Sequence, residues 1–175
     1  MSFLLLSPSP FDANITVLHW SNQPRESPIL LISKPKSSAA QITLFIGNAH
    51  PSNTIGTATF PGKSSAEISL RGIPIHMKMN PWSTKCTVEA GHLGSFKFVQ
   101  DEQMGCEALN MFDASGARIA RFDRAGKGAK KLEMFKHFEP VLFEMVVLTS
   151  LAAWTIHKEL DGAVLKGLGK ALFSM

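Results

Sequence analysis

The chain has 175 residues and a formal net charge of +4; 45% of its residues are hydrophobic and 18% are charged. This length fits a single domain, and this balance of apolar and charged residues excludes an intrinsically disordered chain. With two cysteines, Cys86 and Cys106, the chain also lacks the dense disulfide framework of small secreted domains.

Residues 1–11 are expected to form a flexible leader. They contain a short apolar run and end in a proline-rich turn. The run has no basic flank and is shorter than the apolar region of a secretory signal peptide, while Ser2 in place of glycine excludes N-myristoylation. We therefore expect an intracellular protein, either cytoplasmic or at the surface of a membrane.

From residue 12 onward, short runs of alternating apolar and polar residues are separated by turn signals. Alternation with a period of two residues predicts strands. The runs with this pattern are 15–20, 29–32, 42–46, 54–60, 67–71, 73–80, 84–89, 93–100, 106–112, the second arm of a hairpin that ends at 124, and 130–136. About eleven short strands with turns roughly every 8–12 residues are typical of an antiparallel sandwich or barrel. We expect one such domain over residues 12–158.

The segment 138–158 is expected to be a helix that is apolar on nearly every side, which places it either inside a protein or across a membrane. From Val141 to His157 such a helix is about 25 Å long, shorter than the ~30 Å hydrocarbon core of a bilayer. Glu144 would cost about 2.5–3.5 kcal/mol near the bilayer centre. The sequence therefore predicts a central helix enclosed by the strands, and no transmembrane span.

Residues 159–175 are expected to be a weakly amphipathic C-terminal tail. Four apolar residues recur at intervals of four, and two lysines lie on the other side of the helix they would form. Three glycines weaken that helix, each by up to about 1 kcal/mol. Two interpretations of this tail remain: a helix that lies at a membrane interface, and a tail that packs loosely on the barrel.

Three segments before the central helix, together with the helix itself, resemble the C-terminal half of tubby C-terminal-like domains. These segments are 94–98, 109–122 and 131–135. The closest resemblance is to the LURP-one-related and fungal tubby-like group, which also includes the phospholipid scramblases. It implies a mostly β fold: a closed antiparallel barrel of about twelve strands around one central hydrophobic C-terminal helix. The chain lacks the cysteine-rich tract and the acidic calcium loop of the scramblases, so scramblase activity is not implied, and no phosphoinositide-contacting residue of the family is matched here.

The positive charge of the chain is concentrated between Arg118 and Lys136, where seven basic residues accompany two acidic ones. This segment has a net charge of +5, and the rest of the chain has a net charge of −1. Arg118, Ala120, Phe122 and Arg124 are expected to share one face of a strand. An anionic leaflet attracts nearby basic residues by about 1 kcal/mol each. The candidate lipid- and phosphate-binding residues are Arg118, Arg121, Arg124, Lys127, Lys130 and Lys131. The alternative is a solvated face that only keeps the protein soluble.

Catalytic and metal-binding motifs are not found in the sequence. Six histidines are scattered without the spacing of a zinc site, and the glycines around Lys127 do not match a phosphate-binding loop. Cys106 could act as a nucleophile if a distant histidine lay beside it. Every chain with two cysteines and six histidines allows such a pair, so the composition does not support this hypothesis. We therefore expect a protein that is not an enzyme and that needs no cofactor or metal.

The sequence favours a non-enzymatic domain that binds anionic phospholipid headgroups, such as phosphoinositides, at an intracellular membrane surface. Two alternatives remain: a protein-interaction scaffold without a lipid ligand, and a binder of a small apolar ligand, which would need an empty barrel interior. Nucleic acid ranks below lipid, because the basic segment lacks interleaved aromatic residues and no helix-turn-helix or zinc-finger pattern accompanies it.

Overall fold

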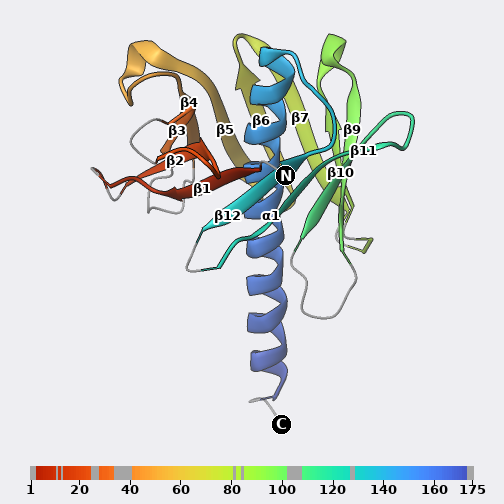
Figure 1. Ribbon diagram of the computed structural model, residues 1–175. Helices are drawn as coiled ribbons and strands as arrows, with labels where there is room; N and C mark the ends of the chain where they lie inside the picture. Colours follow the sequence, from red (N-terminus) through yellow and green to blue (C-terminus); the bar gives the residue numbers. More distant parts are fainter. Residues whose placement is uncertain are drawn as a thin grey trace.

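The computed structural model describes residues 3–10, 12, 14–24, 28–33, 41–80, 82–83, 85–101, 108–126 and 129–172, with side chains described as far as Leu160. Within these residues, twelve strands form a closed antiparallel barrel around one long helix, which confirms the predicted fold class (Figure 1). The strands are β1 (Leu4–Pro8), β2 (Ile15–Trp20), β3 (Leu30–Ser33), β4 (Ile42–Phe45), β5 (Thr54–Gly62), β6 (Ser65–Leu70), β7 (Ile73–Asn80), β8 (Lys85–Glu89), β9 (Ser95–Gln100), β10 (Leu109–Asp113), β11 (Arg118–Arg124) and β12 (Lys130–Met134). The helices are α1 (Pro140–Leu172) and two short 3₁₀ turns, η1 (Pro51–Asn53) and η2 (Gly91–Leu93).

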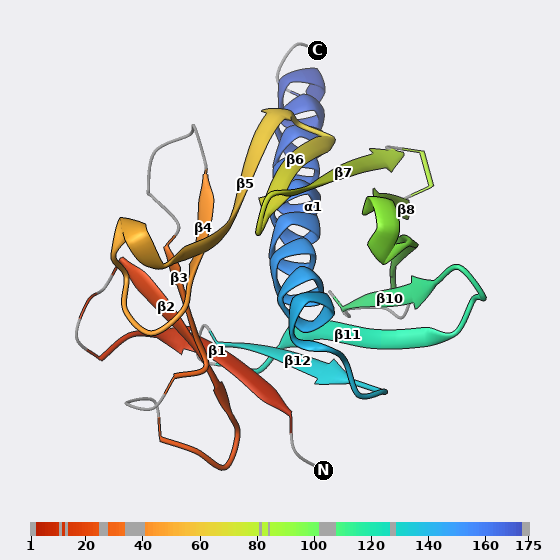
Figure 2. The same ribbon diagram turned by 90° about the horizontal axis from the view of Figure 1, so that it is seen from above.

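Each strand pairs with its neighbour in sequence, and β1 pairs with β12 to close the barrel. Seen from above, the strands surround α1 (Figure 2). Closure leaves no unpaired sheet edge. Because neighbouring strands are antiparallel, the odd-to-even connections, from β1–β2 to β11–β12, all lie at one end of the barrel. The helix α1 leaves the barrel at this end, which is termed the helix-exit end (Figure 1).

The prediction of a flexible leader over residues 1–11 is wrong for the strand β1. Leu4 and Leu6 point into the core and are almost fully buried, and Leu4 pairs with Leu132 across the β1–β12 junction. The run of three leucines shows no alternation, and its partner strand lies at the far end of the chain. Local pattern therefore could not reveal this strand.

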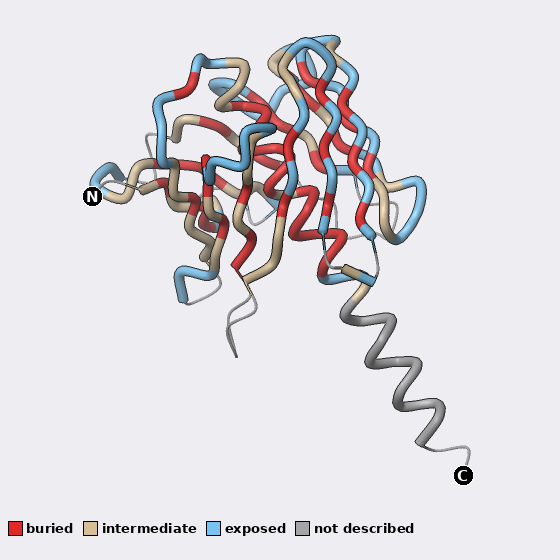
Figure 3. Tube along the Cα trace, turned by 90° about the vertical axis from the view of Figure 1, so that its right-hand side faces the viewer, coloured by how far each residue is buried: buried red, intermediate tan, exposed pale blue. Residues whose placement is uncertain are grey.

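The barrel interior is filled by α1. Met145, Val146, Leu148 and Ala152 on the helix are fully buried, and buried residues alternate with exposed ones along the strands around them (Figure 3). The strand β5 approaches α1 closely at Gly56, where a Cβ atom would lie 2.8 Å from Leu148 Cδ2. A side chain at this position would thus displace Leu148, so the glycine allows the close packing of helix against sheet.

The central helix is longer than the predicted segment 138–158, since α1 continues to Leu172 and includes most of the predicted tail. By length and composition, its part Pro140–Leu160 could cross a membrane, but 72% of its most apolar stretch is buried inside the barrel. This burial agrees with the predicted central position of the helix and with the absence of a transmembrane span.

Glu144, the one carboxylate in the buried part of α1, has a partner on the barrel. Arg71 donates hydrogen bonds from Nε to Oε2 of Glu144 (2.6 Å) and from Nη2 to Oε1 (2.7 Å). Arg71 lies in the β6–β7 turn with φ +48°, followed by Gly72 with φ +80°. The hydrogen bond to Glu144 raises the pKa of the Arg71 guanidinium, so the arginine stays charged. This pair ties the first turns of α1 to the end of the barrel opposite the helix-exit end.

Candidate functional site

The predicted basic surface is divided between the two ends of the barrel. Arg118 begins β11 and Arg124 ends it, so the two are about 20 Å apart. Arg118 is exposed, and its guanidinium carbon lies 4.5 Å from the centre of the Phe135 ring, at the end opposite the helix-exit end. Between the two arginines, Ala120 and Phe122 are buried in the core. Ala120 and Phe122 do share a face of β11, but that face lines the barrel interior, so these four residues do not form one outer basic surface.

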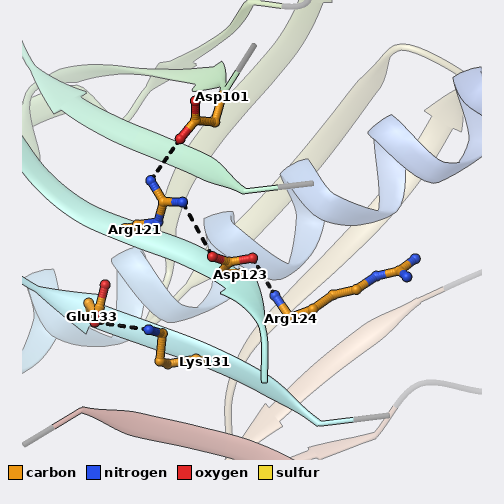
Figure 4. A network of polar contacts seen from close by, with 6 residues as sticks. All are labelled: Asp101, Arg121, Asp123, Arg124, Lys131 and Glu133. Atoms are coloured by element: carbon orange, nitrogen blue, oxygen red, sulfur yellow. Dashed lines mark hydrogen bonds and ion pairs between the residues drawn. The ribbon is translucent and has the colours of Figure 1, made fainter. Parts of the chain in front are cut away.

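Arg121 and Lys131 lie on the outer wall, where acidic residues balance their charge. Arg121 donates from Nη1 to Asp101 Oδ2 (2.9 Å) and from Nη2 to Asp123 Oδ2 (3.3 Å), and Lys131 Nζ lies 3.0 Å from Glu133 Oε1 (Figure 4). The strand register places Arg121 opposite Glu133 and Asp123 opposite Lys131. Two basic and three acidic side chains thus form a mixed network. Arg121 and Lys131 are therefore engaged in ion pairs on the outer wall, and their positive charge is offset by acidic neighbours.

Arg124 and Lys130 lie opposite each other at the helix-exit end, where β11 leads into β12. Lys130 shares a face of β12 with the buried Leu132, so its side chain comes from the inner wall at the mouth of the barrel. Arg124 is exposed, and its backbone N–H donates to Asp123 Oδ1 (2.7 Å). Lys127, the remaining candidate, lies outside the described residues.

A pocket of about 220 Å³ opens beside Lys130. The ammonium nitrogen of Lys130 lies 4.9 Å from the centre of the Trp154 ring, and that of Lys158 lies 5.3 Å from it. Each such cation–π contact contributes about 0.5–1 kcal/mol at an exposed site. The pocket is lined by these two lysines and Trp154, together with Leu6, Ser7, Pro8, Thr16, Ile32, Ile42, Leu151 and Thr155. It has mostly apolar walls and two ammonium groups that converge on one indole; we term it the Lys130–Lys158 pocket.

Trp154 connects this pocket to the core. Its ring meets Phe122 edge to face, with centroids 5.6 Å apart. The sequence indicated Lys130 through the clustering of basic residues but gave no role to Trp154 or Lys158. Their spacing of four residues on one helix face was the available signal. That signal could be interpreted only once α1 was known to pass the start of β12.

Among the histidine and cysteine side chains, His19 and Cys86 are buried in the barrel. His19 is buried: its Nδ1 donates to the Trp20 carbonyl (2.9 Å), so its Nε2 accepts from the Ser7 hydroxyl (3.2 Å). Burial raises the pKa of the free Cys86 thiol to about 12, which disfavours the reactive thiolate. Cys106 lies outside the described residues. Within the described part of the chain, no group of three or more histidine, cysteine, aspartate or glutamate residues could hold a metal ion.

Comparison with known proteins assigns no family to this chain, because no protein-family model and no curated protein sequence matches it. Membership of the tubby-like domains stays a prediction. The architecture that the resemblance implies, twelve strands around a central helix, is the one observed.

Proposed function

We propose that the protein is a binding module for anionic phospholipids at a membrane surface, and that the Lys130–Lys158 pocket receives the lipid. The observation that carries this proposal is the convergence of two ammonium groups on the Trp154 indole at the mouth of an apolar pocket. A phosphate group at the mouth of this pocket would accept charge-assisted hydrogen bonds from lysine ammonium groups. The resemblance to tubby-like domains supports the same class of ligand.

The size of the pocket favours part of a membrane lipid over a complete small molecule. At about 220 Å³ it is smaller than the roughly 300–1,000 Å³ of pockets that enclose a whole small-molecule ligand. The barrel interior is occupied by buried side chains of α1 such as Met145 and Leu148. A lipid bound here would place its phosphate at the lysines and one apolar part against Leu6, Ile32 and Ile42, while the rest stays in the bilayer.

Flotation with vesicles tests the proposal. The protein is expected to float with vesicles that contain phosphatidylserine or phosphoinositides, and not with pure phosphatidylcholine. Binding should weaken with salt, because the screening length falls from about 10 Å at 0.1 M to about 3 Å at 1 M. Loss of two basic contacts costs about 2 kcal/mol, so Lys130→Glu/Lys158→Glu should weaken binding at least about thirtyfold.

The matched control is Arg118→Glu/Lys136→Glu, which makes the same change in charge at the opposite end of the barrel. It should retain most of the binding. Equal losses in both double variants would show that only net charge matters and would contradict the assignment of the pocket. A protein that stays unbound to anionic vesicles at low salt would remove the proposal.

A further inference from the structure

The turn between β7 and β8 presents a tryptophan to solvent. Three large hydrophobic side chains are exposed in the described part of the chain: Trp82 at 94%, Ile46 at 48% and Phe135 at 46%. Tryptophan is normally well buried, since it carries the largest apolar surface of any side chain. The Trp82 ring is therefore accessible to a ligand or to a surface.

Hydrogen bonds to Asn80 fix the backbone of this turn around Trp82. The side-chain oxygen of Asn80 accepts from the Trp82 backbone N–H (2.9 Å), and the Asn80 carbonyl accepts from the Ser83 N–H (3.3 Å). Below the turn, Asn80 pairs with Lys85, and the buried Met79 pairs with the buried Cys86. The exposure of Trp82 is thus a feature of a turn anchored on two core residues.

The surroundings of Trp82 are basic. Residues 77–88 contain Lys78 and Lys85 and no acidic residue. The two lysines border a hollow of about 360 Å³, which Met79, Asn80, Ser83 and Thr87 complete. The β5–β6 turn, with exposed Lys63, lies beside it, because the Met79 N–H donates to the Ser64 carbonyl (2.7 Å).

The acidic residues of the neighbouring outer wall have partners further along the strands. Glu67 Oε2 lies 2.7 Å from His76 Nδ1, and Glu89 accepts from the Ser95 hydroxyl. A hollow bordered by two lysines offers ammonium donors to a phosphate group. The local charge therefore complements an anionic ligand.

We propose that the β7–β8 turn is a second membrane contact, in which Trp82 enters the interfacial layer of an anionic bilayer and Lys78 and Lys85 bind lipid phosphates. This inference rests on the proposed function, because it assumes that the protein binds an anionic membrane. Tryptophan concentrates at membrane interfaces because its ring is apolar and its N–H is polar. Lysine is depleted from protein–protein interfaces, so lysines flanking the tryptophan favour a bilayer over a protein partner.

The position of the turn fits this role. The β7–β8 turn lies at the helix-exit end, as do the β11–β12 connection and the Lys130–Lys158 pocket. Both contacts therefore lie at the end of the barrel from which α1 projects (Figure 1). Two moderate contacts on one surface give tighter binding than either alone.

Tryptophan fluorescence with anionic vesicles tests this inference, because Trp82 is one of three tryptophans and the other two, Trp20 and Trp154, are half-buried and buried. Vesicles should shift the emission to the blue, and lipids with a quencher near the headgroup should reduce it. Because Trp154 lines the Lys130–Lys158 pocket, lipid bound there also changes its emission. The Trp82 signal is therefore the part of the shift and of the quenching that Trp82→Phe removes while vesicle flotation is retained. Soluble glycerophosphate should leave this Trp82 signal unchanged, since it offers phosphate without an interface.

Two variants with a matched control complete the test. Trp82→Ala should weaken vesicle binding about tenfold, and Lys78→Glu/Lys85→Glu at least about thirtyfold. Phe135→Ala, which removes an exposed aromatic ring at the opposite end of the barrel, should leave it unchanged. Because the substituted side chains are exposed, these changes should not disturb the core, and the free energy of unfolding in urea should stay the same.

The outcomes separate this inference from the proposed function. Vesicles that bind without a change in Trp82 emission, or a Trp82→Ala variant that binds normally, would overturn the membrane contact and leave the pocket assignment standing. A shift in Trp82 emission produced by soluble glycerophosphate alone, and lost in Trp82→Phe, would overturn insertion into a bilayer. Absence of vesicle binding in the wild-type protein would overturn both.

Discussion

At the scale of single residues, the Arg71–Glu144 pair shows why a carboxylate is tolerated on a buried helix. The Glu144 side chain is 6% exposed and the Arg71 side chain 41%, so the carboxylate depends on the arginine, while the arginine retains contact with water. Glu144 stands out in the sequence as the acidic residue in an apolar segment. Arg71 does not, because 73 positions separate the two residues and their contact follows only from the closed barrel.

The pair predicts an asymmetry in stability. Arg71→Met should lower the free energy of unfolding by about 2–3 kcal/mol, because it leaves a buried carboxylate unpaired. Glu144→Gln should cost less, about 1–2 kcal/mol, since the half-exposed guanidinium can be hydrated. The double variant Arg71→Met/Glu144→Met should be more stable than Arg71→Met alone. Urea unfolding of the three variants measures this order, and equal costs for the two single changes would contradict it.

Asp113, in the β10–β11 turn, predicts a dependence of stability on pH. Its carboxylate accepts hydrogen bonds from the Ser115 hydroxyl (2.6 Å), from Lys136 Nζ (3.1 Å) and from the Ala117 N–H (3.1 Å). These contacts, with Ser115 the largest cause, lower the pKa of Asp113 from 3.8 to about 2. A carboxylate with a lowered pKa stabilises the fold above its unfolded-state value, and this contribution is lost as the pH falls toward the folded-state value.

The wild-type protein should therefore be more stable than Asp113→Asn at pH 6, and this difference should shrink between about pH 4 and pH 2. Denaturation midpoints measured at intervals across this window test the sign. Ser115→Ala, which removes the strongest of these hydrogen bonds, should reproduce part of the effect. A difference that stays constant down to pH 2 would show that the charge of Asp113 does not contribute.

At the scale of elements, eleven of the twelve strands follow from alternation and turn residues in the sequence, and β1 does not. Strands such as β6 and β7 alternate between exposed and buried positions, so their period is visible. In β1 the outward residue Ser7 is also buried, where it bonds His19. The pattern that identifies a half-exposed strand is therefore absent from β1.

The barrel predicts that β1 is essential. Leu4→Ala should lower the free energy of unfolding by about 2–5 kcal/mol, as expected for a fully buried leucine. Leu5→Ala, at a half-buried outward position on the same strand, should cost clearly less. Chemical denaturation compares the two variants. If both were as stable as the wild-type protein, residues 1–11 would behave as the flexible leader that the sequence suggested.

The sequence also could not show which of the candidate basic residues face a ligand. Clustering of basic residues in sequence selected Arg118 to Lys131, but the pairing of β11 with β12 sends alternate side chains to the outer wall and the inner wall. Arg121 and Lys131 meet acidic residues outside, and Lys130 meets Trp154 inside. Net charge was predictable from the sequence; which charges face a ligand depends on strand register.

At the scale of the whole molecule, the features that fit a membrane gather at one end of the barrel. The Lys130–Lys158 pocket and the Trp82 turn both lie at the helix-exit end, and α1 continues from this end to Leu172 (Figure 1). At the opposite end, Arg71 holds Glu144 and Lys136 holds Asp113. The ion pairs of Arg71 and Lys136 thus lie at the opposite end of the barrel from the Lys130–Lys158 pocket.

The central claim is that the helix-exit end faces an anionic bilayer, and amide hydrogen exchange with and without phosphatidylserine vesicles tests it most directly. Vesicles should slow exchange in peptides that cover the β7–β8 and β11–β12 turns, and leave the β6–β7 and β10–β11 turns at the opposite end unchanged. Protection at the opposite end, or equal protection at both ends, would contradict the orientation.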